Sequence, residues 1–162
     1  MLYLQAEMSL SKKFVTLIIN ILMFVHLRNH SHYSLLKALP KVGDLVKEAK
    51  KMNMSALGLT DYSNMYGVIE FYSSCKKEGI RPIIGAEFDI LYRERRFKIV
   101  LIAKSFAGYK NLMRIISIVN VENPLSPTIT DSLLEEFHEG IIVLSGGIWG
   151  DISNLLIINK DE

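Results

Sequence analysis

Three histidines and an arginine alternate in the stretch FVHLRNHSHYSLL, which covers positions 24–36. Their side chains would all leave one face of an extended strand, because alternate residues of a strand point the same way. These residues are His26, Arg28, His30 and His32. Closely spaced histidines are typical of a metal site, whereas Arg28 is the opposite signal, because a guanidinium stays protonated and offers no lone pair. The stretch therefore indicates either a metal site or the remains of one.

The elements that would position this stretch alternate between strand and helix patterns. Short apolar runs predict strands over 24–27, 55–60, 81–90, 97–104 and 141–147. Helical spacing of apolar residues predicts helices over 42–54, 64–79, 106–120 and 131–140, and a further helix begins at 151. Such alternation predicts an α/β fold with mostly parallel strands. Since these folds place their chemistry at the carboxyl ends of strands, we expect the site directly after the apolar runs.

Composition and charge narrow the class of protein. The chain has 162 residues, 49% hydrophobic and 22% charged, which is typical of one globular domain. The net charge of +2 does not by itself indicate a nucleic-acid surface, and we interpret the basic run at 93–98 as a solvated hairpin. The single cysteine, Cys75, excludes an internal disulfide and favours a reducing, cytoplasmic compartment.

The stretch at 12–25 consists of two lysines followed by about a dozen mostly apolar residues. The run is too short to span a membrane comfortably. It resembles the charged and hydrophobic regions of a signal peptide, but no small-x-small cleavage site follows it. The run also continues into the first predicted strand. We therefore interpret residues 1–23 as an N-terminal extension, with export as the alternative.

Several other polar residues have a structural interpretation. We expect His26 to be a structural histidine, His32 to occupy an exposed turn, and His138 to complement the dipole at a helix end. Asp61 and Asn64 flank a predicted strand-to-helix turn, where short polar side chains commonly hydrogen-bond the backbone.

The residues around the second predicted helix favour a core over a ligand-binding surface. Helical spacing puts Val68, Phe71, Tyr72 and Cys75 on one face. We therefore expect Phe71, Tyr72 and the nearby Tyr66 to be core rather than a stacking platform. Cys75 is expected to be a small buried hydrophobe and not a nucleophile.

The sequence resembles the PHP domain family (polymerase and histidinol phosphatase), in the form found at the start of bacterial DNA polymerase III alpha subunits. The resemblance covers about 24–157 and is carried by four blocks: FVHLRNHSHYSLL, LGLTDYSNMYGVIEFYSSCKKEGIRPIIGAEFDI, LIAKSFAGYKNLMRI and LLEEFHEGIIVLSGG. It implies a distorted, TIM-like βα barrel, here incomplete, with a partial PHP domain over 24–162. In active relatives the barrel mouth holds up to three zinc or manganese ions that activate water for phosphoester hydrolysis.

The resemblance also implies which positions would hold metal. His30 and Glu87 match ligand positions and are the residual candidates. Five further ligand positions carry other residues: Arg28, Tyr62 and Lys98 replace histidines, Lys37 replaces an aspartate, and Gly147 replaces a cysteine. Three of these replacements are cationic and would repel a metal ion. We therefore expect a degraded site with no catalytic residues and no cofactor in this chain.

The resemblance implies that a complete subunit polymerises DNA with magnesium held in a separate palm domain, which we expect to lie outside these 162 residues. The expected role of this chain is structural. It would pack against the remainder of the alpha subunit, could dock a proofreading exonuclease, and would meet DNA through the holoenzyme, without a membrane. Two alternatives stay open: a free-standing metal-dependent PHP phosphoesterase or 3'-5' exonuclease-type proofreading domain, and a pure binding module or gene remnant.

Overall fold

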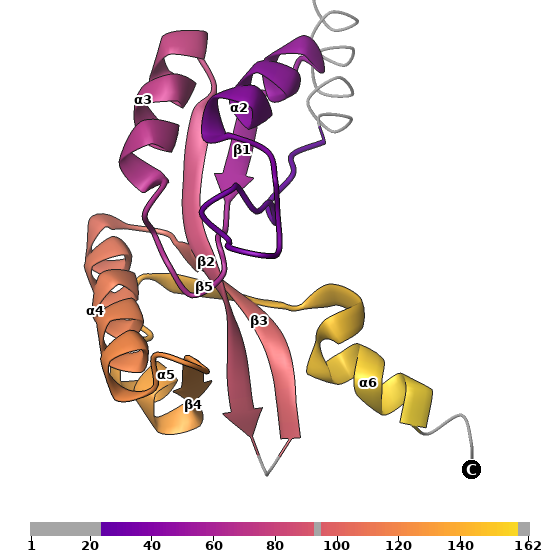
Figure 1. The fold of residues 1–162 in the computed structure, drawn as a ribbon, viewed down its shortest axis with the longest axis vertical. Coiled ribbons are helices and arrows are strands. Elements are labelled where there is room, and N and C mark those ends of the chain that lie inside the picture. The colour runs from indigo at the N-terminus through magenta and orange to yellow at the C-terminus, as the bar shows by residue number, and fades with distance from the viewer. Residues whose placement is uncertain (1–23, 93–94, 159–162) are drawn as a thin grey trace, which may run out of the picture.

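The computed structural model describes residues 24–92 and 95–158 (Figure 1). The interpretation of residues 1–23 as an extension, and the first two residues of the basic run at 93–98, therefore lie outside the described residues. The elements in chain order are α2 (Val42–Lys51), β1 (Ala56–Leu59), α3 (Val68–Glu78), β2 (Arg81–Tyr92), β3 (Arg95–Ala103), α4 (Phe106–Glu122), β4 (Thr128–Thr130), α5 (Asp131–Glu136), β5 (Ile141–Ser145), the 3₁₀ turn η1 (Gly147–Trp149) and α6 (Asp151–Ile158).

The strands form one mixed sheet with the order β1-β2-β3-β5, and β4 pairs with β2. The pairs β1–β2 and β2–β4 are parallel, whereas β2–β3 and β3–β5 are antiparallel. The α/β class is confirmed, but the expectation of mostly parallel strands is wrong. Only two residues separate β2 from β3, so this connection is a hairpin and not a helical crossover. Over the described residues the sheet is not closed, which is consistent with an incomplete PHP barrel.

The predicted strand at 24–27 is an extended segment without regular strand pairing. Two backbone bonds hold it beside β1, from Gly58 N to His26 O and from Thr60 N to Asn29 O, both 2.8 Å. The Asn29 side chain donates to Gly58 O at 3.0 Å and so replaces a main-chain ladder bond. Glycine is required here, because a Cβ at Gly58 would lie 2.4 Å from Leu27 O.

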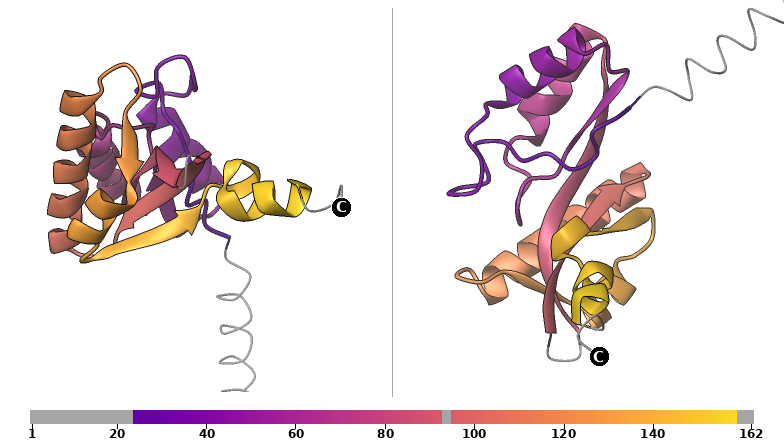
Figure 2. Two further views of the ribbon diagram at one scale, coloured as in Figure 1. Left: turned by 90° about the horizontal axis from the view of Figure 1, so that it is seen from below. Right: turned by 90° about the vertical axis from the view of Figure 1, so that its right-hand side faces the viewer.

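Two separate apolar clusters hold the helices against the sheet. One joins α2 and α3 to β1 through Val46, Leu59 and Phe71. The other joins α4 to β2, β3 and β4 and includes Phe88 and Ile115. Figure 2 shows α4 and α6 on opposite sides of the sheet.

The aromatic residues near α3 behave differently from one another. Phe71 and Cys75 are fully buried, as the helical spacing predicts. Tyr66 and Tyr72 are 73% and 46% exposed, so assigning them to the core was wrong. The buried stripe of α3 consists of Val68, Phe71 and Cys75, and Tyr72 lies beside this stripe.

Candidate functional site

The acidic residues of the candidate site come from the face of β2 that points away from α4. Alternation along the strand buries Ala86 and Phe88 under α4 and directs Glu87 and Asp89 to the opposite side. Glu87 lies in the middle of β2 and not at its end. Its backbone N–H donates to Asp61 O at 3.1 Å, and its carbonyl accepts from Ser63 N at 2.8 Å. The loop after β1 is thereby held against β2.

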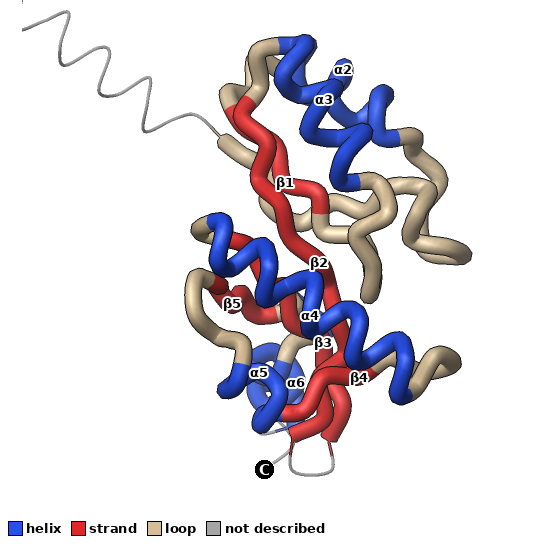
Figure 3. The backbone as a smooth tube through the Cα atoms, turned by 90° about the vertical axis from the view of Figure 1, so that its left-hand side faces the viewer, coloured by secondary structure: helices blue, strands red, loops and turns tan. Residues whose placement is uncertain are grey.

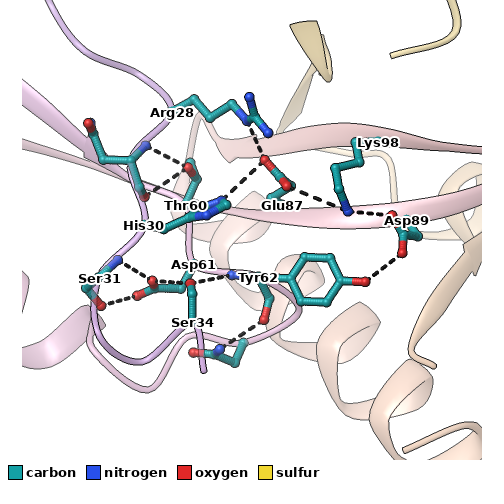
Figure 4. A network of polar contacts seen from close by, with 12 residues as sticks. Arg28, His30, Ser31, Ser34, Thr60, Asp61, Tyr62, Glu87, Asp89 and Lys98 are labelled. Carbon is teal, nitrogen blue, oxygen red and sulfur yellow. Dashed lines mark hydrogen bonds and ion pairs between the residues drawn. The ribbon is translucent and has the colours of Figure 1, made fainter. Parts of the chain in front are cut away.

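Glu87 is the centre of an ion-pair cluster, drawn in Figure 4. Its side chain is only 1% exposed. Arg28 Nε donates a hydrogen bond to Oε2. His30 Nε2 lies 3.3 Å from the same oxygen, and Lys98 Nζ lies 3.9 Å from Oε1. Burial by itself raises the pKa of Glu87, but the contacts with His30 and Arg28 outweigh it and lower that pKa to about 2. Glu87 is therefore an ionised carboxylate surrounded by nitrogen donors.

Asp89 forms a second centre next to Glu87. Lys98 Nζ donates to Oδ1 at 2.7 Å, and the Tyr62 hydroxyl donates to Oδ2 at 2.6 Å. Burial, followed by the hydrogen bond to Asp89, raises the pKa of Tyr62 well above its ordinary value, so Tyr62 remains a protonated donor. Lys37 Nζ and Lys98 Nζ lie 3.9 Å and 4.5 Å from the centre of the Tyr62 ring, within cation–π range.

Asp61 is a buried carboxylate that fixes the loop between the two cationic positions Arg28 and Lys37. It accepts hydrogen bonds from Ser31 N at 2.6 Å, from Ser31 Oγ at 2.7 Å and from Ser34 Oγ at 2.6 Å. Ser34 Oγ in turn accepts from Tyr62 N at 3.0 Å. Asp61 therefore acts as a local scaffold, and one of its bonds is to backbone, as the sequence indicates.

Gly147 borders the same cluster from the other end of the sheet. It follows β5 with φ +64°, a conformation that favours glycine. An added Cβ would have only Arg28 Nη1 within 4 Å, at 3.9 Å. All seven positions that the family resemblance singles out thus converge on one place: Arg28, His30, Lys37, Tyr62, Glu87, Lys98 and Gly147.

The other predicted polar residues have separate roles. His26 packs edge-on against Phe24, with ring centres 4.5 Å apart, and His32 packs at a tilt against Tyr33, with ring centres 4.2 Å apart. His138 Nδ1 lies 2.6 Å from Glu135 O at the end of α5. These three histidines contact neighbours outside the Glu87 cluster.

Asn64 binds backbone as expected, since its Nδ2 donates to Tyr33 O at 3.0 Å and to Tyr62 O at 2.9 Å.

One site residue escaped the sequence reasoning. Asp89 has no counterpart among the metal positions, yet it accepts from both Lys98 and Tyr62. Its position two residues after Glu87 on a predicted strand could have revealed it, because such residues share a face.

The donor set of the cluster is mainly cationic. Over residues 24–92 and 95–158, no three His, Cys, Asp or Glu side chains are grouped so that they could hold a metal ion. Both oxygens of Glu87 instead face nitrogen atoms, from Arg28 and His30 on one side and Lys98 on the other. The arrangement neutralises buried carboxylates and ties three segments together.

The fold agrees with what the sequence comparisons find. The chain belongs to the PHP domain family, whose model matches residues 26–162. Among individual proteins, it is similar to the DNA polymerase III alpha subunit of Borreliella burgdorferi, with 40% identity over 151 residues, or 86% of this chain and 13% of that protein. It is 41% identical over 144 residues to the corresponding subunit of Vibrio cholerae, covering 86% of this chain and 12% of that protein.

The chain therefore spans only a small part of the length of these curated relatives. Among solved structures, it is similar to an amidohydrolase from Chromobacterium violaceum that contains sulfate and no metal. That match has 20% identity and a TM-score of 0.49, and it covers 60% of this chain and 32% of the other. Of the helices in the described part of the chain, none has the length and apolar character that crossing a membrane requires.

Proposed function

We propose that this chain forms part of the PHP domain of a bacterial DNA polymerase III alpha subunit. In this proposal an ion-pair cluster takes the place of the family's metal site. The role of the chain is then structural: residues 24–162 pack against the remainder of the subunit and provide a surface for partners. The support is the 40% and 41% identity to such subunits, together with the cationic residues around Glu87. The polymerase activity, its magnesium and its DNA substrate would belong to other parts of that subunit.

The observation that carries this proposal is the hydrogen bond from Arg28 to Glu87. A metal ligand must offer a lone pair, and a guanidinium has none. Two unit positive charges 4 Å apart repel each other by about 4 kcal/mol at an effective dielectric of about 20, and a divalent ion is repelled more strongly. Arg28 and Lys98 both lie within 4 Å of Glu87, so a metal bound to this carboxylate would meet both charges. The residues present do not fit a metal cluster.

The same cations give the cluster a structural use. Glu87 is buried and ionised, and a buried charge without a partner is strongly destabilising. Arg28 comes from the extended segment beside β1, and Lys98 from β3. The two cations therefore compensate the carboxylate as metal ions would, and join those segments to β2.

The same proposal indicates the binding partners of the chain. In this proposal the chain contacts the remainder of the polymerase subunit, and a proofreading exonuclease is a second candidate partner. The compartment is the cytoplasm, where bacterial replication takes place. Co-expression of the chain with the rest of its own polymerase subunit, followed by affinity purification, should recover both together.

Metal analysis tests the central claim. The purified chain is equilibrated with zinc or manganese, separated from free metal, and measured by elemental analysis, in parallel with hydrolysis of p-nitrophenyl phosphate. We expect substoichiometric metal and no hydrolysis above background. Stoichiometric metal, with hydrolysis lost in His30→Ala but retained in the control His138→Ala, would instead establish a metal-dependent phosphoesterase.

A further inference from the structure

One stretch of β2 lacks the helical cover that the rest of the strand has. Ala86, Phe88 and Ile90 are buried under α4. Pro82 and Ile84 share their face of the strand but are only half-buried. The hairpin between β2 and β3 explains this, because a helical crossover in its place would supply a helix over β2. Figure 3 looks onto this side of the sheet, with α3 and α4 as separate helices over its two ends.

A groove of about 460 Å³ occupies this position, and we call it the α3–α4 groove. It is lined by Val68, Ile69 and Tyr72 of α3, Pro82 and Ile84 of β2, Ala103 at the end of β3, Lys104 and Ser105 after it, and Phe106 and Tyr109 of α4. Several of these apolar side chains are widely exposed, with Ile69 at 73% and Phe106 at 71%. The groove thus presents a concave apolar surface of the kind that marks an interaction site.

The rim of the α3–α4 groove is positively charged. Lys104 lines it directly. Lys76 Nζ lies 5.5 Å from the centre of the Tyr72 ring on the α3 side, and Lys110 Nζ lies 4.8 Å from the centre of the Phe106 ring on the α4 side. The described residues that line the groove include no aspartate or glutamate. A partner that fills it should therefore be apolar at its centre and acidic at its edges.

Over Arg81–Ile84, β2 pairs with β1 on one side, and β3 pairs with β2 only from Gly85 onward. Pro82 and Ile84 line the groove from the face of β2 that also carries Ala86 and Phe88, so the groove opens on that face of the sheet. The partner therefore has to lie on the face of the sheet, in the layer that α3 and α4 occupy. An amphipathic helix suits this position, because its apolar stripe would pack on β2 while its flanks reach both neighbouring helices.

We propose that the α3–α4 groove is the docking site for an acidic amphipathic helix of a partner protein. This inference goes beyond the structural role above and does not depend on the state of the metal site. A helix is favoured over single-stranded nucleic acid by the concave, aliphatic floor of Val68, Pro82 and Ile84. Nucleobases bind to open aromatic faces, whereas Phe106 and Tyr109 stack on each other, with 17° between their ring planes.

Fluorescence anisotropy with defined probes tests the proposal on the full chain. The first probe is a labelled peptide of ~14 residues, about four helical turns, with Leu and Phe at i, i+4 and i+7 and Glu or Asp elsewhere. The second probe has the same apolar residues with Lys in place of every acidic residue. The third probe is labelled oligo-dT. We expect saturable binding of the acidic peptide and much weaker binding of the other two.

Two groove variants and two matched controls locate the binding. Ile69→Asp and Lys104→Glu should each weaken binding of the acidic peptide by about tenfold, as loss of a central interface contact does. The controls are Leu125→Asp, at an apolar position that is 97% exposed outside the groove, and Lys47→Glu on the exposed side of α2. Both should leave binding within about twofold, since interface energy concentrates in few residues. Circular dichroism of each variant verifies its fold.

The proposal is overturned by any of four results. The acidic and basic peptides could bind equally, or the acidic peptide could fail to bind at the highest soluble concentration. Oligo-dT could bind and be weakened by Lys104→Glu, which would make the groove a nucleic-acid surface. Equal effects of the groove variants and their controls would place the peptide elsewhere.

Discussion

Arg28 and Glu87 are 59 residues apart in sequence, and the guanidinium of the first donates to the carboxylate of the second. The pair is asymmetric, because the Arg28 side chain is 38% exposed and that of Glu87 is 1% exposed. Arg28 therefore reaches from the protein surface to a charge that water cannot solvate. Because of this asymmetry, leaving Glu87 without its partner should cost more stability than leaving Arg28 without its partner.

Replacing Arg28 should destabilise the chain much more than removing an exposed ion pair. We expect Arg28→Met to lower the free energy of unfolding by about 2 kcal/mol, less than for a fully buried pair because Arg28 is partly solvated. Urea denaturation followed by circular dichroism measures this change. The control is Lys51→Met, which breaks the exposed pair with Glu48 and should change stability much less. Equal effects of the two variants would contradict the asymmetry.

The acid stability of the chain should depend on Glu87. Its pKa falls from an ordinary 4.5 to about 2 in the folded state, so on acidification the unfolded state takes up the proton first. The stabilisation is present above pH 4.5 and is lost as the pH falls through about 2. Its full size is about 3 kcal/mol at 1.36 kcal/mol per pKa unit. Unfolding free energies of the wild type and Glu87→Gln between those pH values test this, and the variant should have the flatter profile. Parallel profiles would show that other groups control acid unfolding.

The hydroxyl of Tyr62 should have a measurable structural value. Tyr62→Phe removes its hydrogen bond to Asp89 while keeping the ring under Lys37 and Lys98. We expect a loss of about 1.5 kcal/mol, since the lost bond is charge-assisted and partly buried. Tyr66→Phe, at a position 73% exposed, is the control and should change stability by under ~0.5 kcal/mol. Thermal unfolding of both variants is the measurement, and a neutral Tyr62→Phe would refute the assignment.

Two glycine-to-alanine substitutions should act in opposite directions. A Cβ at Gly108 of α4 would lie 1.8 Å from Gly140 O, so Gly108→Ala must separate two backbones and should cost about 3 kcal/mol or more. A Cβ at Gly43 of α2 meets nothing within 4 Å, so Gly43→Ala should stabilise the chain by about 0.5–1 kcal/mol through helix propensity. Midpoints of urea unfolding compare them. A tolerated Gly108→Ala would mean that the approach of α4 to the turn at Gly140 is not tight.

The sequence predicts most of the secondary structure because hydrophobic periodicity is local. The helices at α2 and α3 and the strands at β2 and β5 lie close to their expected ranges. The direction of strand pairing could not be predicted, since the apolar pattern of β3 is the same whether it runs parallel or antiparallel to β2. The exposure of Tyr72 was missed for a similar reason, because periodicity does not tell whether a neighbouring helix covers a given flank.

For the candidate site, the spacing of residues along the chain predicts which positions belong to the site. It does not predict which of their side chains contact one another. His30 and Glu87 could be singled out from the family pattern, and Arg28 and Lys98 recognised as departures from it. That Lys98 lies 2.7 Å from Asp89 but 3.9 Å from Glu87 depends on the antiparallel register, which pairs Asp89 with Lys98. Such distances follow from tertiary structure, and no local pattern contains them.

The bonds of Asp61 to Ser31 and Ser34 hold the loop without involving the side chains at 28, 30 or 37. The hydrogen bonds that hold this loop are therefore separate from the contacts that Arg28 and His30 make with Glu87. A substitution at 28, 30 or 37 leaves the bonds of Asp61 in place, although it removes the contacts of the replaced side chain. A chemist who wished to install a new binding specificity here could vary those three side chains as a library and leave Asp61 and both serines untouched.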